Sequence, residues 1–389
     1  MRVPNNIRYI MIRCAYVTHH LAKTSEGGAE VQIQWTEEQI TRLRPEYNIS
    51  RFNPWTDSID EFDLIHIFAP TNFAAESARI ATYAKTRGKI VLTSPIFHPY
   101  PGDGGWSSLY ACLTNKLLTN LRRAFLSGPL SRLNPHIWLY HTLTNSDMIL
   151  PNSKQEADIL SQYFDIEHER IRVIPNGIDS RFAQANPKLF TDQYGLKNFI
   201  LFVGRIEPVK NTTMLIEAFK HSGLDTDLVI IGRPVDPTYY ERCRILSSER
   251  VHIFPPMHPQ DEMFLSAYAA AKVVALPSLY ETVGLVALEG GLAGANVVVT
   301  EVGGAREYLR DDAWYVDPQN ISSISHGLRS AYNSPKTSFL RERLANDYSW
   351  EETGKLTAQA YDYVLNSTDR KIMLAQSAED VDKIAQSRA

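Results

Sequence analysis

Short apolar runs alternate along the chain with longer stretches whose apolar residues recur at helical spacing. Because neighbouring parallel strands need a long connection, usually a helix, this alternation is typical of α/β proteins built on parallel sheets. We therefore expect a doubly wound α/β fold. The runs expected to form strands are 8–12, 64–68, 89–94, 148–150 and 171–174 in the first half, and 199–203, 228–231, 251–254, 273–275 and 297–300 in the second.

The expected strands fall into two groups, and 389 residues are more than one ordinary domain needs. Turn-forming residues cluster at 176–179 and at 186–187, which predicts the seam between two domains there. The first domain is expected over 1–182 and the second over 183–345. The remainder, 346–389, is expected to form a helix that packs back on the first domain, followed by a tail.

Helices are expected between the strands. The segment 152–164 is predicted to be helical because Ser153 followed by Glu156 forms a capping box, which satisfies free backbone donors at a helix start. Further helices are expected over 213–221 and 261–271.

The composition is that of a globular protein, with 44% hydrophobic and 22% charged residues. The net charge of −4 gives no basic field that would indicate nucleic acid as a partner. The apolar stretch 7–15 contains Arg8 and Arg13, which favours a strand over a secretory signal, and no run of about 18 apolar residues indicates a membrane span. Three separated cysteines predict neither a disulfide framework nor a metal site, which favours the cytoplasm.

Gly204 and Arg205 directly follow the expected strand 199–203, and Lys210 comes five residues after Arg205. In open parallel sheets ligands bind beyond the carboxyl ends of strands, so these residues stand where a ligand is expected. Glycine lets the backbone approach a ligand, and two cations can neutralise a diphosphate. Taken alone, the same residues also fit an ordinary solvated loop.

The segment 277–289, P-S-L-Y-E-T-V-G-L-V-A-L-E, follows the expected strand 273–275. A helix is expected to begin near Gly284, which leaves its first amides free to contact an anionic or hydroxyl-rich ligand. Glu281 precedes this helix, where its carboxylate can reach the hydroxyls of a bound sugar. The alternative is an acid that complements the helix dipole.

Glu289 falls on the stripe of this helix that is expected to face the core, which is formed by Leu285, Leu288 and Leu292. A carboxylate there is costly unless it is paired or hydrogen-bonded. A ribose diol would offer two donors to its oxygens, and a hydrogen-bonded structural glutamate is the alternative.

Glu281 and Glu289 together reproduce an E-x7-E pattern, and the chain resembles the retaining GT-B glycosyltransferases of the glycogen synthase-like group, the glycosyl transferases group 1. Four more elements of that family occur in the family's order: G-G-x-E at 27–30, I-P-N-G-[IV]-D at 174–179, V-G-R-x4-K-N at 203–211 and G-G-x-x-E at 303–307. The resemblance covers nearly the whole chain. It implies the GT-B architecture, in which two Rossmann-like domains face a central cleft.

The resemblance implies a role for each matching residue. Arg205 and Lys210 are expected to bind the donor diphosphate and to stabilise it as it leaves. Glu289 is expected to hold the nucleotide ribose, and Glu281 the donor sugar. The backbone amides expected to share in holding the sugar are those of Thr282, Val283, Gly284 and Leu285.

Three more positions match the family. Met257, just past the expected strand 251–254, corresponds to a position whose backbone contacts the base. Gly28 would approach the phosphates from the first domain. His98 is similar to the family histidine that lines the sugar site, although the sequence alone also fits a loop histidine.

The sequence departs from the family pattern at Gly290-Gly291, which we expect to add flexibility to the helix, and at Asn296 and Pro99. No charged group is lost at these positions, so activity is expected to persist.

The resemblance also implies transfer with retention, in which the departing phosphate accepts the acceptor proton and cations stabilise its charge. No protein nucleophile, divalent metal or other cofactor is expected. Asp225-Thr226-Asp227 matches the D-x-D metal motif literally, but it precedes the expected strand 228–231. It is therefore predicted to lie at the amino end of the sheet, away from the ligand.

The expected partners are a nucleotide-diphosphate sugar, with UDP favoured, and an acceptor that is a glycan, a lipid-linked molecule or a small molecule. Such an activity would serve polysaccharide assembly or the glycosylation of a metabolite. The loop 98–106 is either an acceptor contact or a plain surface loop. The stretch 110–125 has leucines on one face and cations nearby, which fits either a peripheral contact at the inner membrane face or a helix packed in the core.

Two other functions fit parts of the sequence. A nucleotide-sugar epimerase of the same broad fold would not need Glu281 and Glu289 in this arrangement. A catalytically silent homologue acting as a binding or scaffold subunit would have no reason to keep Arg205, Lys210 and Glu281 together. Turnover of a nucleotide sugar without a partner protein discriminates the enzyme from the scaffold.

Overall fold

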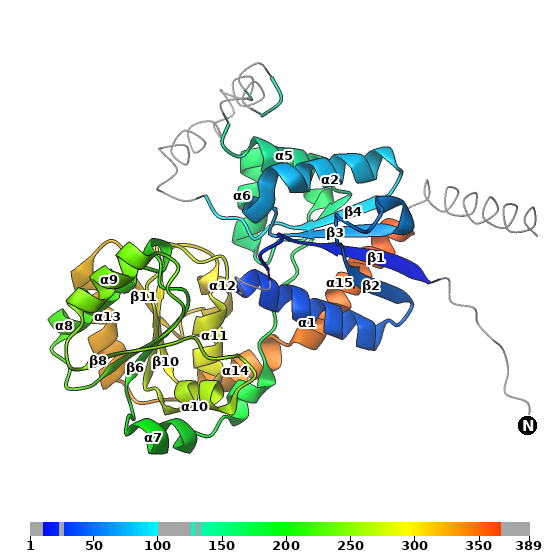
Figure 1. Ribbon diagram of the computed structural model, residues 1–389. Helices are drawn as coiled ribbons and strands as arrows, with labels where there is room; N and C mark the ends of the chain where they lie inside the picture. The colour runs from blue at the N-terminus through cyan, green and yellow to red at the C-terminus, as the bar shows by residue number, and fades with distance from the viewer. Residues whose placement is uncertain (1–10, 23–26, 100–125, 129–130, 132–133, 367–389) are drawn as a thin grey trace, which may run out of the picture.

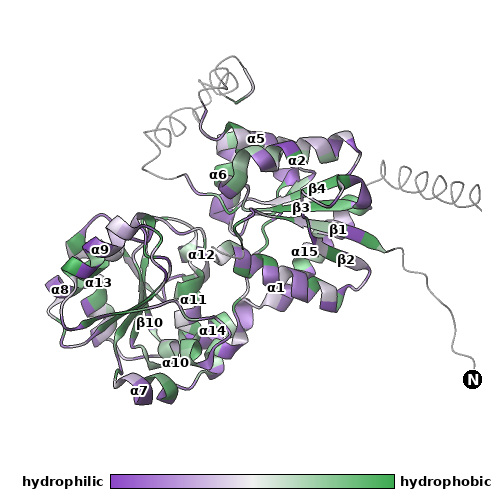
Figure 2. Cartoon of the chain, in the orientation of Figure 1, coloured by the Kyte–Doolittle hydropathy of each residue, from purple (hydrophilic) through white to green (hydrophobic). Residues whose placement is uncertain are grey.

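The computed structural model describes residues 11–22, 27–99, 126–128, 131 and 134–366. Within them the chain forms two α/β domains, each built on one parallel sheet with helices on both faces (Figure 1). Apolar residues concentrate in the strands, whereas polar residues lie on the outer faces of the helices (Figure 2). This distribution agrees with the requirement that a parallel sheet be covered on both sides.

The first domain has a five-stranded sheet in the order β2-β1-β3-β4-β5, and every neighbouring pair is parallel. Its strands are β1 (Ile12–Val17), β2 (Tyr47–Arg51), β3 (Leu64–Phe68), β4 (Ile90–Ser94) and β5 (Met148–Ile149). Its described α-helices are α1 (Gly28–Leu43), α2 (Ala74–Thr86), α5 (Ile137–Thr144) and α6 (Lys154–Phe164).

The second domain has a six-stranded parallel sheet in the order β11-β10-β9-β6-β7-β8. Its strands are β6 (Ile200–Val203), β7 (Leu228–Ile231), β8 (Val251–Phe254), β9 (Val273–Leu276), β10 (Asn296–Thr300) and β11 (Trp314–Val316). Its helices are α7 (Lys188–Tyr194), α8 (Thr212–Ser222), α9 (Pro237–Leu246), α10 (Glu262–Ala270), α11 (Leu285–Leu292), α12 (Ala305–Leu309), α13 (Ile321–Asn333) and α14 (Phe339–Asp347). Because β6 pairs with β9, the loops after these two strands meet at the carboxyl edge of the sheet.

All five strands expected in the second domain are present within one residue of their expected bounds. Two expectations in the first domain were wrong. In the described residues the first strand runs over Ile12–Val17 and so ends five residues later than expected, because Cys14–Val17 pair with β3 and are buried in the core. Residues 8–10 of the expected strand lie outside the described residues. The segment 171–174 makes only an isolated bridge from Ile171 to Ile149, because β5 ends after two residues and leaves no ladder to extend.

The expected helix 152–164 begins two residues later, at Lys154, with Ser153 as its N-cap. The Ser153 hydroxyl accepts a hydrogen bond from the Glu156 amide at 3.0 Å, which confirms this half of the capping box. The Glu156 carboxylate has other partners, since it accepts from the amides of Asn152 at 2.8 Å and Phe97 at 2.7 Å. Its burial raises the pKa of this carboxyl to about 7.

The last described helix, α15 (Trp350–Leu365), packs against α1 of the first domain. The Tyr361 hydroxyl lies 2.7 Å from Nδ1 of His66 on β3 and 2.9 Å from the Tyr16 hydroxyl on β1. All three side chains are buried, and burial lowers the pKa of His66 to about 3, so its ring is neutral at physiological pH. The helix that follows the second domain therefore packs on the first domain.

The glycine pair in α11 allows close packing of this helix. A Cβ on Gly290 would lie 2.6 Å from Cβ of Val274 on β9, and one on Gly291 would lie 2.8 Å from Cδ1 of Leu344 on α14. Both distances are below ordinary contact, so neither position has room for a side chain. The pair therefore allows α11 to pack closely on β9 and α14, and the flexibility expected from the sequence stays a prediction.

No helix in the described part of the chain is long and apolar enough to cross a membrane. The stretch 110–125 and residues 100–106 of the expected acceptor loop lie outside the described residues.

Candidate active site

The loop after β6 forms one part of the site. Gly204 has a φ of 151°, a conformation that favours glycine, and its carbonyl oxygen lies 1.8 Å from the point that a Cβ on Gly232 would occupy. Two glycines thus allow the loops after β6 and β7 to touch. Arg205 follows, with Nη2 2.9 Å from Oε1 of Glu207 and a side chain that is 39% exposed. Its guanidinium is therefore accessible to a ligand.

Lys210 and Glu281 form an ion pair. Lys210 ends the short 3-10 turn η7 (Pro208–Lys210), and its Nζ donates to Oε1 of Glu281 at 2.7 Å. The side chains are 21% and 10% exposed, so this pair is largely shielded from water. Two charges that are 71 residues apart in the sequence thus meet where β6 and β9 end.

The backbone of Glu281 is held on both sides. Its amide donates to the Val302 carbonyl at 3.1 Å, and its carbonyl accepts from the Gly304 amide at 3.0 Å. Gly303 has a φ of 113°, and a Cβ there would lie 1.8 Å from the Glu281 carbonyl oxygen. The G-G-x-x-E element therefore fixes the position of Glu281.

Helix α11 begins just after Glu281. Its N-cap is Gly284, with a φ of 77°, so no side chain caps the first turn. The uncapped helix start lies beside the Lys210–Glu281 pair, which gives the site backbone donors as well as a cation.

Glu289 lies one turn further along α11 and is hydrogen-bonded to Tyr268 on α10. The Tyr268 hydroxyl donates to Oε2 of Glu289 at 2.7 Å. Burial is the main reason that the pKa of Glu289 rises to about 7, and the nearby carboxylate of Asp179 adds to it. Within the described part of the chain this carboxylate therefore has one hydrogen-bond partner, and its raised pKa means that it ionises near neutral pH.

The Gly27-Gly28 pair of the first domain lies against these loops. A Cβ on Gly28 would be 3.7 Å from Cδ1 of Leu285, and one on Gly27 would be 4.0 Å from Nη1 of Arg205. Residues from both domains thus border the same site.

His98 also reaches the second domain. Its ring stacks on that of Tyr280, with centroids 5.2 Å apart and planes at 16°. Burial lowers the pKa of His98, so its ring favours the neutral form. The backbone before it is constrained, since Ile96 has a φ of 49° and the Phe97 amide is bound by Glu156.

The structure thus brings five predicted residues to one place, Gly28, His98, Arg205, Lys210 and Glu281, and Glu289 lies one turn into the adjoining helix. Met257 is half-buried after β8, the outer strand of the sheet, further along the same edge. Sequence reasoning missed Tyr268 and Tyr280, which contact Glu289 and His98. Tyr280 stands in the quoted motif beside Glu281, whereas nothing in the sequence marks Tyr268.

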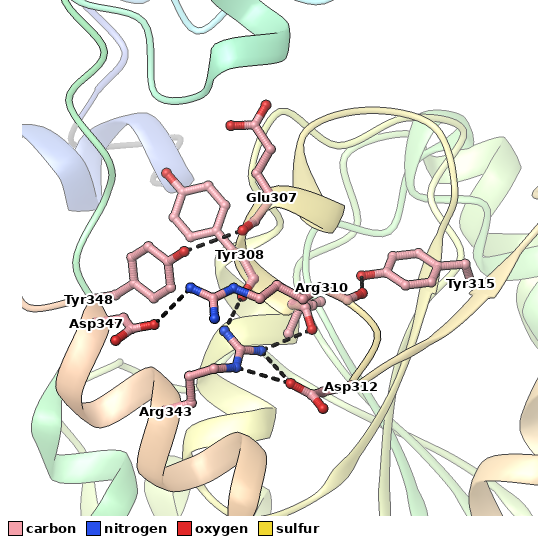
Figure 3. A network of polar contacts seen from close by, with 9 residues as sticks. Glu307, Tyr308, Arg310, Asp312, Tyr315, Arg343, Asp347 and Tyr348 are labelled. Atoms are coloured by element: carbon pink, nitrogen blue, oxygen red, sulfur yellow. Dashed lines mark hydrogen bonds and ion pairs between the residues drawn. The ribbon is translucent and has the colours of Figure 1, made fainter.

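Glu307, the acid of the G-G-x-x-E element, joins the two domains. Its carboxylate accepts from the amides of Lys154 at 2.8 Å and Gln155 at 2.6 Å, at the N-terminus of α6. In Figure 3 this carboxylate points away from the polar cluster formed by Arg310, Asp312, Arg343 and their neighbours. One domain therefore caps a helix of the other, where the helix dipole favours a negative charge.

Tyr308 makes the next link between the domains. Its buried hydroxyl donates to the Asn152 carbonyl at 2.6 Å and accepts from the Asn176 amide at 3.0 Å. Its own carbonyl accepts from Nη1 of Arg343 at 2.7 Å (Figure 3).

Replacing Tyr308 by phenylalanine is expected to lower the free energy of unfolding by about 2–4 kcal/mol, because two buried backbone groups lose their partner. Urea denaturation measures this loss. Tyr315→Phe is the matched control, since the Tyr315 hydroxyl also donates to a carbonyl, that of Arg310, at 2.6 Å but in an exposed place. Equal losses in the two variants would contradict a special role for the domain contact.

The D-x-D sequence lies at the amino end of β7, as expected. Asp225 pairs with Arg250, and Oδ1 of Asp227 lies 2.9 Å from Nε2 of His252. Both carboxylates therefore have protein partners on the side of the sheet opposite to Arg205 and Lys210.

Comparisons with known proteins agree with this arrangement. Residues 17–182 match the model of Glycosyltransferase Family 4, and residues 190–347 match that of the glycosyl transferases group 1. A D-inositol 3-phosphate glycosyltransferase of Nocardia farcinica is 30% identical over 187 residues, which cover 44% of this chain and 41% of that protein. A glycogen synthase of Mycobacterium tuberculosis is 28% identical over 258 residues, which cover 61% of this chain and 59% of that protein. The matched region thus spans about half the length of the curated relatives.

Solved structures resemble the fold over most of its length. Sucrose-phosphate synthase from Thermosynechococcus elongatus has a TM-score of 0.66 at 18% identity, covering 91% of this chain and 99% of that one. HepE from Anabaena, in complex with UDP-glucose, has a TM-score of 0.66 at 15% identity, covering 90% and 100%.

Two parallel-sheet domains in this arrangement form the GT-B fold. Residues 17–182 form a Glycosyltransferase Family 4 domain and residues 190–347 a glycosyl transferases group 1 domain, so the two domains follow one another along the chain.

Proposed function

We propose that this protein is a retaining glycosyltransferase that moves a sugar from a nucleotide diphosphate, UDP in the first place, to a glycan, lipid-linked or small-molecule acceptor without a metal. The observation that carries the proposal is the Lys210–Glu281 pair at the carboxyl edge of the second sheet, beside Arg205 and the uncapped start of α11. Cations and backbone donors suit the diphosphate, and a carboxylate suits sugar hydroxyls.

Arg205 and Lys210 stabilise the charge that grows on the diphosphate as the sugar leaves. In the ligand-free chain Glu281 holds Lys210 in place. When the donor binds, Lys210 turns its charge to the phosphates, while Glu281 accepts hydrogen bonds from the sugar. His98, stacked on Tyr280 one residue before Glu281, lines the sugar site from the first domain.

Retention requires the acceptor hydroxyl to approach the sugar from the face that the nucleotide leaves. The leaving phosphate takes the acceptor proton, so no protein nucleophile takes part. Glu281 suits a positioning role, because its carboxylate is bound to Lys210 and its backbone is bound to Val302 and Gly304.

No metal takes part in this proposal. The two cations do the work that a divalent ion does in D-x-D enzymes, and the carboxylates of the D-x-D sequence are bound to Arg250 and His252.

Glu289 holds the ribose: one of its oxygens accepts from Tyr268, and the other accepts from the diol, while the backbone near Met257 contacts the base. Because the pKa of Glu289 is about 7, UDP affinity is expected to rise between about pH 6 and pH 8, as the carboxylate ionises and accepts from the ribose.

The same raised pKa of Glu289 affects folding stability. The unfolded state loses this proton at lower pH than the folded state does, so the free energy of unfolding falls as pH rises from about 4.5 to 7.

Isothermal titration of UDP across this pH range tests the role of Glu289, with Glu289→Gln as the matched variant. Because the variant lacks the Glu289 carboxyl, its pH profile shows only the effect of the titration of the nucleotide itself. Parallel pH profiles in the two proteins would contradict a ribose contact by Glu289.

UDP is the favoured nucleotide because solved structures of similar fold contain UDP and UDP-glucose. The purified chain, incubated with UDP-, GDP-, ADP- and dTDP-sugars in EDTA, is expected to release the diphosphate of one donor slowly. NMR of the anomeric proton in a transfer product tests retention. If no donor binds or turns over, even with Mn²⁺ and acceptors added, the silent-scaffold function replaces this proposal.

Candidate acceptors are tested as a panel chosen from the names of the similar proteins. The panel contains D-inositol 3-phosphate, a glucan and a sugar phosphate. We place the reaction in the cytoplasm. If the acceptor is lipid-linked, the enzyme reaches it at the inner face of the membrane. Co-sedimentation with anionic vesicles separates that acceptor class from the other two.

A further inference from the structure

His19 and Glu30 form a close pair beside the Gly27-Gly28 loop. His19 follows β1, and its Nε2 lies 2.8 Å from Oε1 of Glu30 in the first turn of α1. The other oxygen of Glu30, Oε2, accepts a hydrogen bond from the Gly27 amide at 2.8 Å. Both side chains are only 13% exposed. Among the residues that the structure describes, the Glu30 carboxylate therefore has one partner on each oxygen and is largely shielded from water.

This carboxylate also lies near a cation of the second domain. The point that a Cβ on Gly27 would occupy is 3.4 Å from Oε2 of Glu30 and 4.0 Å from Nη1 of Arg205. Arg205 is one of the two cations proposed to bind the diphosphate. A negative charge so close to that place repels an anionic donor, and the shielding from water strengthens the repulsion.

The side chain at position 30 nevertheless has a structural role at the start of α1. A glutamate at the third position of a helix reaches back to the amide of the N-cap residue, which here is Gly27, and orders the start of the helix. This cap brings the negative charge of a carboxylate to the start of the helix. Nε2 of His19 lies where it can donate to that carboxylate and offset its charge.

We propose that His19 is a positioning residue for the nucleotide-diphosphate donor and acts through Glu30. Glu30 fixes Gly27, so that the first free amides of α1 face the phosphates, and His19 compensates the Glu30 charge. The inference rests on the proposed function and adds to it a residue that does not itself touch the donor.

His20 and Glu76 provide a matched control. Nε2 of His20 lies 2.9 Å from Oε1 of Glu76, which lies in the first turn of α2. The pair has the same chemistry at a neighbouring helix start, but the His20 side chain is 50% exposed and the Glu76 side chain 38%. In the described part of the chain, neither side chain contacts Gly27.

The test measures UDP affinity by isothermal titration in the full chain carrying His19→Ala, Glu30→Gln, both changes, or His20→Ala. His19→Ala is expected to weaken UDP binding about 10-fold, because it leaves the carboxylate uncompensated. Glu30→Gln keeps an oxygen for the Gly27 amide without a charge, so it is expected to bind UDP nearly as the wild type does. Combined with His19→Ala, it is expected to restore binding, and His20→Ala is expected to have no effect.

Rescue by Glu30→Gln is the decisive result, because a merely structural role of His19 would make the double variant worse. Melting temperatures of all four variants control for misfolding. Unchanged affinity in His19→Ala, or a loss that Glu30→Gln does not restore, overturns the inference while the donor site stands. Failure of the wild-type chain to bind UDP or any other nucleotide of the donor panel overturns the proposed function, and this inference with it.

Discussion

Replacing Lys210 by alanine is expected to lower kcat by about 100- to 1,000-fold, because the variant loses a charged donor that stabilises the leaving diphosphate. The change acts where negative charge grows during the reaction, so kcat falls more than the affinity for the donor. Steady-state kinetics with the donor identified by the panel measures the effect. The loss also leaves Glu281 without its partner at 2.7 Å, so a modest fall in melting temperature is expected alongside.

Lys220→Ala is the matched control for this variant. Lys220 lies on the same connection, in the last turn of α8, and is exposed. It is expected to keep wild-type kinetics. A kcat for Lys210→Ala near that of the wild type would remove Lys210 from the proposed mechanism, whatever the donor.

Replacing Gly303 by alanine is expected to abolish activity and to lower the free energy of unfolding by about 3 kcal/mol or more, because a buried clash adds to backbone strain. The added Cβ would lie 1.8 Å from the Glu281 carbonyl oxygen, and the φ of 113° is strained for any residue with a side chain. Glu281 would have to move and would lose its place beside Lys210. Urea denaturation and donor turnover measure the two effects.

Gly294→Ala separates the effect of backbone strain from the effect of displacing Glu281. Gly294 also has a positive φ, 86°, but no atom lies within 4 Å of its added Cβ. This control is expected to cost about 1–2 kcal/mol through strain alone and to keep its activity. Equal loss of activity in both variants would show that Gly303 does not act through Glu281.

Much of the second domain could be predicted from the sequence because its strands are buried on both faces. Such strands appear as short continuous apolar runs, and the residues that follow them lie at one edge of a parallel sheet. Gly204, Arg205 and Glu281 were assigned to that edge for this reason. The first domain was harder, because β2 is an exposed edge strand and the segment 171–174 is apolar without forming a ladder.

Contacts between distant segments were beyond prediction. No local pattern indicates that Lys210 binds Glu281, that Tyr268 binds Glu289, or that Glu307 caps a helix of the other domain. Each contact depends on how two loops or two domains pack, and a single sequence carries no record of that packing.

The sequence by itself determined the α/β class, the positions of five of the six strands in the second domain and the residues that follow β6 and β9, because these depend on local hydrophobic period and turn chemistry. Only the tertiary structure decided which of those residues meet. The Lys210–Glu281 pair, the His19–Glu30 pair at Gly27 and the contact of Tyr308 with both Asn152 and Asn176 each join elements that are remote in the chain. Their geometry comes from the packing of whole sheets and helices, which local preferences do not specify.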